Sequence, residues 1–281
     1  MSDEYILTLS CPDRAGIVHA VTGTLLERGG NITEAAQYND QSTGLFFMRV
    51  QFNCKSAPDD LRAGFLPIAA SFDMKWQLAE AGRRMPTVVL VSKLGHCLND
   101  LLFRHRSGLL SLDIKAIVSN HRDFYQLAAS YDIAFHHIPV TADTKPQAEA
   151  RLLQVIQDEA AELVILARYM QVLSDGLCRS LEGRAINIHH SFLPSFKGAR
   201  PYHQAHARGV KIIGATAHYV TAALDEGPII EQDVARVDHS MDVGALTALG
   251  RDVESVVLAR AVQWHAQRRV LVDGNKTVIF T

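Results

Sequence analysis

The sequence lacks the features that would tie a protein to a membrane or to an oxidising compartment. Its four cysteines are scattered, with no Cys-x-x-Cys pair, which indicates reduced thiols rather than disulfides. No apolar run approaches the roughly 18 residues that cross a bilayer. The acidic start at Asp3 and Glu4 is unlike a secretory leader. We therefore expect a cytoplasmic protein with no membrane partner.

An excess of charge of one sign is also missing. The formal net charge is −2 and the sequence pI is near 6.7, so nucleic acid is not expected as a partner. Hydrophobic residues make up 48% and charged residues 21% of the chain, a balance that allows a sizeable buried core. The length of 281 residues favours two domains.

The amino-terminal part, residues 1–80, is expected to form a domain of its own. Its apolar patterns predict strands and helices in the order βαββαβ, which is that of a ferredoxin-like fold. The expected strands cover 5–10, 32–38, 44–52 and 73–78, and the expected helices cover 17–26 and 57–70.

A polar stretch over 81–86, with no apolar period, is typical of a linker. Beyond it, residues 87–281 are expected to form the second domain. Short apolar strands alternate there with helical stretches, which predicts a Rossmann-like, mostly parallel sheet covered on both faces. The expected strands cover 87–91, 114–119, 134–138 and 163–167, with a long helix over 241–267 and a terminal strand over 269–280.

The densest polar cluster follows a short apolar strand. Asn187 and His189 are two residues apart, so their side chains point to one face of an extended chain. Further along, Asp225 lies in a turn between two strand-like segments. An amide and an imidazolium can donate hydrogen bonds to a developing oxyanion, while a carboxylate positions a nucleophile and manages its proton. This pattern suits acyl transfer without a covalent nucleophile.

The same residues carry a resemblance to a known family. The Asn-x-His pattern, the Ser-x-Leu-Pro stretch over 191–194 and the Asp225 turn before Gly227 together resemble the folate-dependent formyltransferases. The resemblance implies that Asn187, His189 and Asp225, here called the trio, are catalytic and that the substrate is 10-formyltetrahydrofolate. It implies no metal and no cofactor besides this substrate.

Two further segments are similar to that family. Residues 166–173 resemble its pterin-side loop, and residues 214–220 match another of its stretches. The resemblance implies folate contacts and a histidine behind the trio. The implied folate contacts are Met170, Gln171, Leu173 and Val220, and the supporting histidine is His218.

The amino-terminal part separately resembles the ACT domains, which are small regulatory units that often bind amino acids. The match lies in the turn after the first strand and in the residue after the Gly29-Gly30 pair. It implies an amino-acid effector and a homodimer or homotetramer, because edge strands of such a unit can pair between protomers. The implied effector residues are Asp13, Gly16, Ile17 and Asn31.

The acceptor of the formyl group is argued from the stretch after the first strand of the second domain. Formyltransferases that act on phosphorylated amines resemble one another in a glycine-rich phosphate loop there, whereas residues 92–100 contain one glycine and several bulky side chains. Water is therefore the expected acceptor, and the released formate would feed purine synthesis. Transfer to an amine remains open, as does an amino-acid sensor with an inactive second domain.

Several other polar residues have ordinary interpretations. His190, His203 and His206 match no recognised metal-ligand spacing, so we expect hydrogen-bonding or surface roles. Ser191 lacks the Gly-x-Ser-x-Gly elbow of a nucleophile, which favours a loop hydrogen bond. The segment with Lys197, Arg200 and Tyr202 fits either contact with the glutamate tail of folate or a solvated loop.

Overall fold

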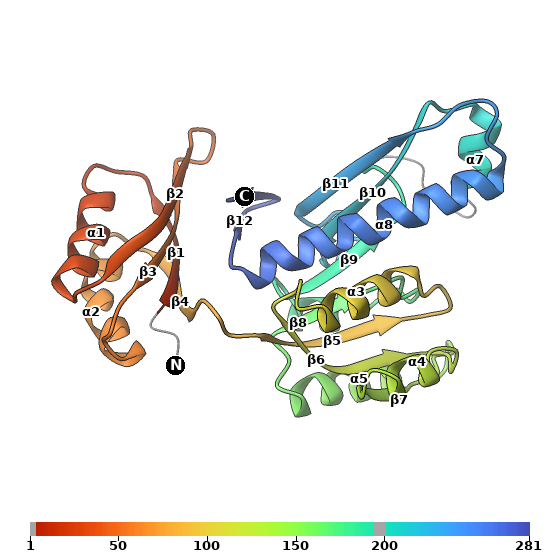
Figure 1. The fold of residues 1–281 in the computed structure, drawn as a ribbon, viewed down its shortest axis with the longest axis horizontal. Coiled ribbons are helices and arrows are strands. Elements are labelled where there is room, and N and C mark those ends of the chain that lie inside the picture. The colour runs from red at the N-terminus through yellow and green to blue at the C-terminus, as the bar shows by residue number, and fades with distance from the viewer. Residues whose placement is uncertain (1–3, 194–200) are drawn as a thin grey trace. The chain divides into compact units, whose positions relative to one another are not determined.

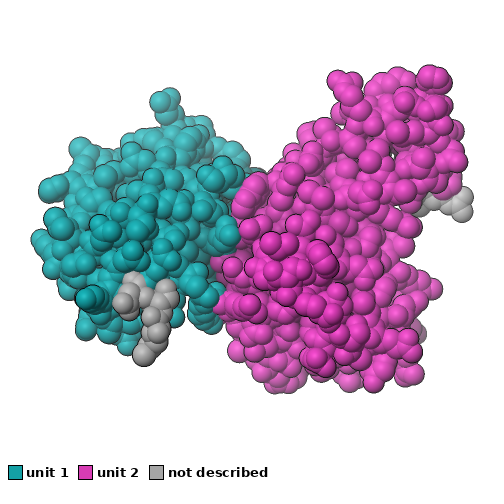
Figure 2. Space-filling view, in the orientation of Figure 1, with its two compact units in different colours: residues 1–83, 267–281 teal, residues 84–266 magenta. Residues whose placement is uncertain are grey.

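The computed structural model describes residues 4–193 and 201–281, which are arranged as two compact units (Figure 1). Unit 1 combines the residues up to Arg83 with Gln267–Thr281, and unit 2 is Arg84–Ala266 (Figure 2). Within the described ranges, no helix combines the length and the apolar character needed to cross a membrane.

Unit 1 has the expected βαββαβ order. Its antiparallel sheet has the strand order β2-β3-β1-β4. Alternate residues of β3, including Phe46, Met48 and Val50, are buried in one core with residues of the helices. The elements are β1 (Glu4–Pro12), α1 (Ile17–Glu27), β2 (Asn31–Asp40), β3 (Leu45–Asn53), α2 (Pro58–Ser71) and β4 (Lys75–Glu80).

The last residues of the chain belong to unit 1, whereas the sequence placed them in the second domain as one strand. They form a hairpin of β12 (Val270–Asp273) and β13 (Lys276–Ile279). The physical reason is a buried cation on β3: Arg49 is 1% exposed and donates hydrogen bonds to the carbonyl of Gln267. Glu34 lies 3.2 Å from Arg49 and 2.9 Å from Arg269. This pairing between distant segments could not be read from the local pattern.

Unit 2 contains a seven-stranded sheet in the order β11-β10-β9-β8-β5-β6-β7. Strands β5 to β9 run parallel, and β10 and β11 are antiparallel additions beside β9. The expected mostly parallel sheet is confirmed. The strands are β5 (Met85–Val91), β6 (Leu112–Ser119), β7 (Ala134–His137), β8 (Leu163–Leu166), β9 (Ala185–His189), β10 (Ile212–Tyr219) and β11 (Ile229–Arg236).

Helices connect and cover these strands. The longest, α8, packs against β9, β10, β11 and α3, as Figure 1 shows in blue. Buried strands lined by Val, Ile and Leu on both faces need such cover. The helices are α3 (His96–Arg106), α4 (Tyr125–Ala129), α5 (Lys145–Asp158), α6 (Asp175–Ser180), α7 (Pro201–Arg208) and α8 (Val243–Ala266).

Candidate active site

The candidate site begins at the carboxyl end of β9. Ile186 and Ile188 are buried at 0% and 3% exposure, while Asn187 and His189 between and beyond them are only half-buried. Because strand side chains alternate, the two apolar residues anchor one face and the two polar residues share the other. The sequence prediction that Asn187 and His189 point to one face agrees with this burial pattern.

Asp225 lies in the turn that connects β10 to β11. Its backbone has a positive φ of 56°, a conformation that aspartate tolerates better than most residues. The turn folds back so closely that a Cβ on Gly227 would lie 1.8 Å from the carbonyl oxygen of Tyr219. Only glycine fits at that position, so the Asp-Glu-Gly sequence is what brings the Asp225 carboxylate back to the end of β9.

The trio and His218 meet within hydrogen-bonding range or just beyond it. His189 Nδ1 lies 3.2 Å from Asp225 Oδ2. On the neighbouring strand, His218 is the register partner of Asn187, and its Nε2 lies 3.2 Å from the Asn187 amide nitrogen. Residues 187, 189, 218 and 225, which the sequence singled out, are therefore adjacent in the fold.

The tautomer of His218 follows from its backbone contact. Its Nδ1 lies 2.9 Å from the carbonyl of Tyr219, and a carbonyl can only accept, so Nδ1 carries the proton. A neutral His218 then offers a lone pair at Nε2, which accepts from the amide of Asn187. The 3.6 Å separation between Nε2 and Asp225 Oδ1 is too long for a hydrogen bond. His218 is thereby placed to fix which way the Asn187 amide faces.

The electrostatics of the site hold Asp225 in its ionised form. The hydrogen bond from His189 keeps the pKa of Asp225 far below its usual range despite partial burial. The other ring nitrogen of His189, Nε2, is buried and has no hydrogen-bond partner among the described residues. A buried, unpartnered imidazole nitrogen is the type of group that a ligand oxygen can satisfy.

A second histidine packs against the first. The rings of His189 and His190 are stacked with centroids 4.7 Å apart and planes at 23°. Arg168 donates from a terminal guanidinium nitrogen to His190 Nδ1 at 2.9 Å. Burial, and then the positive charge of Arg168, lower the pKa of His190 to about 4. His190 is therefore a neutral ring beside the trio.

Behind Arg168 lies a buried carboxylate, Glu254 of α8. It is 1% exposed and accepts from His96 Nε2 at 2.7 Å and from Tyr202 at 2.9 Å, with Arg168 Nε at 3.4 Å. Burial acts to raise the pKa of Glu254, but the hydrogen bond from His96 and the charge of Arg168 outweigh it, so that the pKa lies below the ordinary value. Glu254 is thus an anion that organises three partners.

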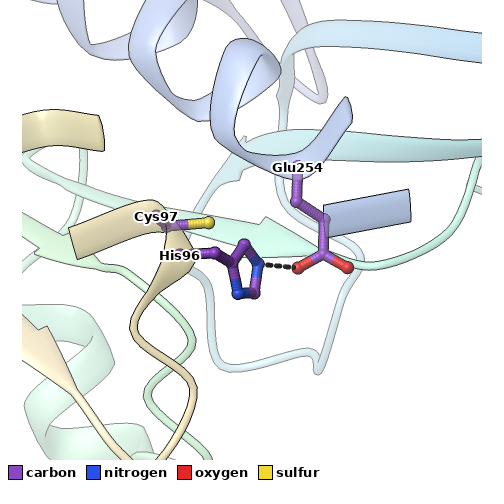
Figure 3. Close-up of side chains that lie close together, drawn as sticks. All are labelled: His96, Cys97 and Glu254. Carbon is purple, nitrogen blue, oxygen red and sulfur yellow. Dashed lines mark hydrogen bonds and ion pairs between the residues drawn. The ribbon is translucent and has the colours of Figure 1, made fainter. Parts of the chain in front are cut away.

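The described residues contain one group of side chains with the donor types of a metal site, namely His96, Cys97 and Glu254 (Figure 3). Figure 3 shows the histidine ring in direct contact with the carboxylate. At 2.7 Å this contact is a hydrogen bond, with no gap for an ion between the two groups. Burial, and then Glu254, raise the pKa of the Cys97 thiol, which favours the protonated form. The observed arrangement is an ion-pair network.

Sequence reasoning missed Arg168, His190 and Glu254 as parts of the site. A signal for Glu254 is present, because Gly250, Glu254, Val257 and Ala261 follow the helical period and all are buried. A lone carboxylate on the apolar stripe of a helix is expected to have a buried partner. Nothing comparable in the sequence marks the contact between Arg168 and His190.

The implied folate residues are placed in different surroundings. Met170 is 58% exposed, and its backbone amide donates to Ser92 at 2.9 Å. Leu173 belongs to a buried core cluster against which Val220 packs. Gln171 and Leu173 line a small pocket that contains none of the trio. The structure therefore makes Met170 available to a ligand and gives Leu173 and Val220 packing roles.

The implied effector residues of unit 1 do not come together. Asp13 follows the end of β1 and accepts a hydrogen bond from Asn39. Gly16 caps α1 with a φ of 96°, and Ile17 is buried at 2% exposure. Asn31 begins β2 and pairs with Asn53, which in turn pairs with Glu4 at the start of β1, so Asn31 lies at the opposite end of the sheet from Asp13.

The loop after β9 is only partly described. Pro194 of the family motif, and Lys197 and Arg200, lie outside the described residues. Tyr202 is on α7 and bonds Glu254, so it is engaged inside the protein. The hydroxyl of Ser191, for which a loop hydrogen bond was expected, has no partner within the described ranges; the backbone carbonyl of Ser191 accepts from Thr216.

Comparison with known proteins gives the same division of the chain. Residues 5–63 match the model of the ACT domain, and residues 85–262 match that of the formyl transferases. The formyltetrahydrofolate deformylase of Corynebacterium sp. strain P-1 is 55% identical, over 98% of this chain and 97% of the relative.

Solved structures show the likeness in three dimensions. The formyltetrahydrofolate deformylase of Burkholderia mallei superposes with a TM-score of 0.96 at 54% identity and covers 99% of both chains. The glycinamide ribonucleotide transformylase 1 of Symbiobacterium toebii has a TM-score of 0.65 at 29% identity and covers 70% of this chain and 95% of its own. The likeness to the transformylase thus extends over only part of the chain.

Proposed function

This chain belongs to the formyltetrahydrofolate deformylase family, and on that premise we propose that it hydrolyses 10-formyltetrahydrofolate to tetrahydrofolate and formate at the trio. The observation that carries the assignment is the contact of His189 with Asp225, which leaves the buried Nε2 of His189 without a partner among the described residues. Asp225 contacts the opposite ring nitrogen of His189, and the Asn187 side chain comes from the same face of β9, so the other two groups that the chemistry requires belong to the same cluster.

The first step is attack of water on the formyl carbon. Asp225 holds the water and receives its proton. Because Asp225 is a weak base, with a pKa far below its usual range, the proton leaves the water as the new carbon–oxygen bond forms rather than before. Protonated His189 donates from Nε2 to the developing oxyanion. The amide of Asn187 has a second N–H besides the one directed to His218, and it supplies the other donor.

The second step breaks the bond between the formyl carbon and N10 of the folate. The oxyanion collapses to a carbonyl, the electron pair of the breaking bond passes to N10, and the proton held on Asp225 returns to that nitrogen. Formic acid and tetrahydrofolate leave, the acid loses its remaining proton to solvent as formate, and Asp225 is again ionised. The cycle consumes one water and, as proposed, requires no metal and no cofactor.

Water is the acceptor because the loop after β5 is engaged in internal contacts. Ser92 donates to the side chain of Asn120 at 2.7 Å and accepts from the amide of Met170. The Phe124 ring lies so close to Gly95 that a Cβ there would be 2.3 Å from it. The backbone N–H of Ser92 also donates to the carbonyl of Arg168, so this segment packs internally where a transferase would need open backbone amides for a phosphorylated amine.

The assignment is tested by formate release from 10-formyltetrahydrofolate with no amine present. We expect continuous turnover by the unaltered chain and a loss in both Asn187→Ala and Asp225→Ala. Near-normal release by both folded variants would show that the chemistry lies elsewhere. Release that stops after one equivalent would favour transfer to an amine, and the absence of any turnover would favour a sensor.

Unit 1 provides the regulatory part of the proposal. Asp13 and Asn31 lie at opposite ends of one sheet, so one small amino acid can reach both only if a second copy lies alongside in the opposite direction. The edge strand β2, exposed or half-buried over most of its length, is available for such pairing. We expect a homodimer or homotetramer, located in the cytoplasm and supplying formate to purine synthesis. A monomer in light scattering at all amino-acid concentrations would contradict this arrangement.

A further inference from the structure

A continuous chain of contacts links a buried acid to the trio within unit 2. It runs from Glu254 to Arg168 over 3.4 Å, from Arg168 to His190 over 2.9 Å, and from His190 to His189 by ring stacking. The last member contacts Asp225 at 3.2 Å. The side chains of Glu254 and Arg168 are 2% and 10% exposed, so each charge loses most of its hydration, and that desolvation penalty must be offset by the other charge.

The direction of the hydrogen bonds along this chain is fixed by residue type. A guanidinium only donates, so His190 Nδ1 must accept, and His190 carries its proton on Nε2 as a neutral ring. Glu254 only accepts when ionised; its oxygens accept hydrogen bonds from His96 and Tyr202 and form an ion pair with Arg168. One buried anion thus holds the cation that sets the state of His190.

We propose that Glu254 is a positioning residue of the hydrolysis site, which acts through Arg168 to hold His190 as a neutral ring stacked on His189. The inference rests on the proposed function, because it concerns the orientation and charge of His189 in that reaction. Two effects follow from it. The stacked ring of His190 limits the rotation of the His189 ring. The negative charge of Glu254 balances the positive charge of Arg168, which would otherwise repel a proton on His189.

The charge balance explains why an uncharged residue would not serve at position 254. The charged and titratable groups around the stacked histidines are Arg168, Glu254, Asp225 and Tyr202, with His96 behind Glu254 and His218 beside Asp225. Two carboxylates balance Arg168 and a protonated His189 among them. Removing the charge of Glu254 leaves one carboxylate for two cations in a poorly solvated site, which disfavours the proton on His189.

The first test is Glu254→Gln in the full chain, measured as formate release over a range of pH. We expect kcat to fall by about tenfold to a hundredfold, because small displacements of a catalytic group are costly, while KM changes by less than about threefold. The alkaline limb of the kcat profile should move to lower pH. Asp233→Asn is the matched control, because the Asp233 carboxylate likewise forms an ion pair with an arginine, Arg260, but this pair lies at the surface.

The second test separates positioning from stability. Breaking a buried pair on one side is strongly destabilising, whereas neutralising both partners is tolerated better. The double variant Arg168→Met with Glu254→Gln should therefore recover much of the unfolding temperature lost in Glu254→Gln. We expect its alkaline limb to return towards that of the unaltered chain while kcat stays low, because His190 has lost its donor. Recovery of full kcat together with stability would overturn the proposal.

These outcomes are distinguishable from failure of the proposed function. If Asn187→Ala and Asp225→Ala abolish turnover while Glu254→Gln retains normal kcat and pH dependence, the inference fails and the function stands. If none of the three variants loses turnover, the proposed function itself is wrong, and the inference about Glu254 is wrong with it. Stoichiometric zinc in the purified protein that is lost in Glu254→Gln would also overturn the inference, because Glu254 would then be a metal ligand.

Discussion

The polar residues of unit 2 and those of unit 1 are arranged in opposite ways. In unit 2, Asn187, His189 and Asp225 come from a strand and a turn, yet the fold brings them together, and Glu254 adds a buried charge behind them. In unit 1, Asp13 and Asn31 are exposed and lie at opposite ends of a sheet.

This difference indicates which of the two candidate sites is assembled within a single chain. The proposed catalytic groups of unit 2 lie together within a single chain, so no partner is needed to assemble the trio. The proposed effector residues Asp13 and Asn31 of unit 1 lie apart in one chain, so binding through them would require a second copy. We therefore expect substitutions in unit 2 to change turnover and those in unit 1 to leave it nearly intact.

The largest effect is expected from Asp225→Asn. It removes the base that receives the proton of the water and the negative charge beside His189, so formate release should fall by about a hundredfold to ten-thousandfold. The control is Glu226→Gln, which neutralises the exposed neighbour in the same turn. Equal losses in both variants would mean that the turn, and not the Asp225 carboxylate, is what matters.

Asn187→Ala should come next, with a loss of about a hundredfold in kcat and little change in KM, because an oxyanion donor acts mainly in the transition state. Steady-state kinetics of formate release measures both constants. A rise in KM with kcat unchanged would assign Asn187 to substrate binding instead.

A backbone variant tests how the turn delivers Asp225. Gly227→Ala puts a methyl group 1.8 Å from the Tyr219 carbonyl, so the turn must move and kcat should fall by about tenfold or more. Gly176→Ala, in α6, meets nothing nearer than 4.0 Å and should leave kcat unchanged. Full activity in Gly227→Ala would show that the close approach does not position the carboxylate.

His190 makes the stability of unit 2 depend on pH. Its pKa of about 4 in the folded chain lies below its ordinary value, so the unfolded chain takes up the proton first as pH falls. Stability is complete above about pH 6.5 and is lost towards pH 4, by up to about 3 kcal/mol. Urea unfolding across this range should give a flatter curve for His190→Phe. Identical curves would mean that His190 does not titrate in this way.

The smallest effect on turnover is expected in unit 1. Glu34→Gln leaves Arg49 and Arg269 without their shared carboxylate, which should lower the unfolding temperature of unit 1 while turnover changes by less than about twofold. The exposed Glu27→Gln on α1 serves as control. A large loss of turnover in Glu34→Gln would break the contrast between the two units.

Much of this molecule could be predicted from its sequence, because the informative patterns are local. The strand period and the Asn-x-His spacing set the common face of Asn187 and His189, and the Asp-Glu-Gly turn has a steric cause within a few residues. The strands of both sheets were predicted from local patterns as well, alternating in unit 1 and short and apolar in unit 2.

The parts that could not be predicted depend on pairing between distant segments. The last residues were expected in the second domain because a strand pattern does not say which sheet or unit the strand joins. The contact of buried Arg49 with the carbonyl of Gln267 places them in unit 1. The link from Glu254 to His190 passes through Arg168 and joins three separate elements. The separation of Asp13 and Asn31 follows from sheet order, which a motif does not contain.

The most direct test of the account is hydrolysis in water enriched in oxygen-18 with no amine present. The proposed reaction forms the new carbon–oxygen bond from water, so each formate released should carry one labelled oxygen, over many turnovers per chain. Asp225→Asn should lower the amount of labelled product by about a hundredfold to ten-thousandfold while the folded state is retained. Formate without label, or label that appears in one turnover only, would contradict the claim that water is the acceptor at this site.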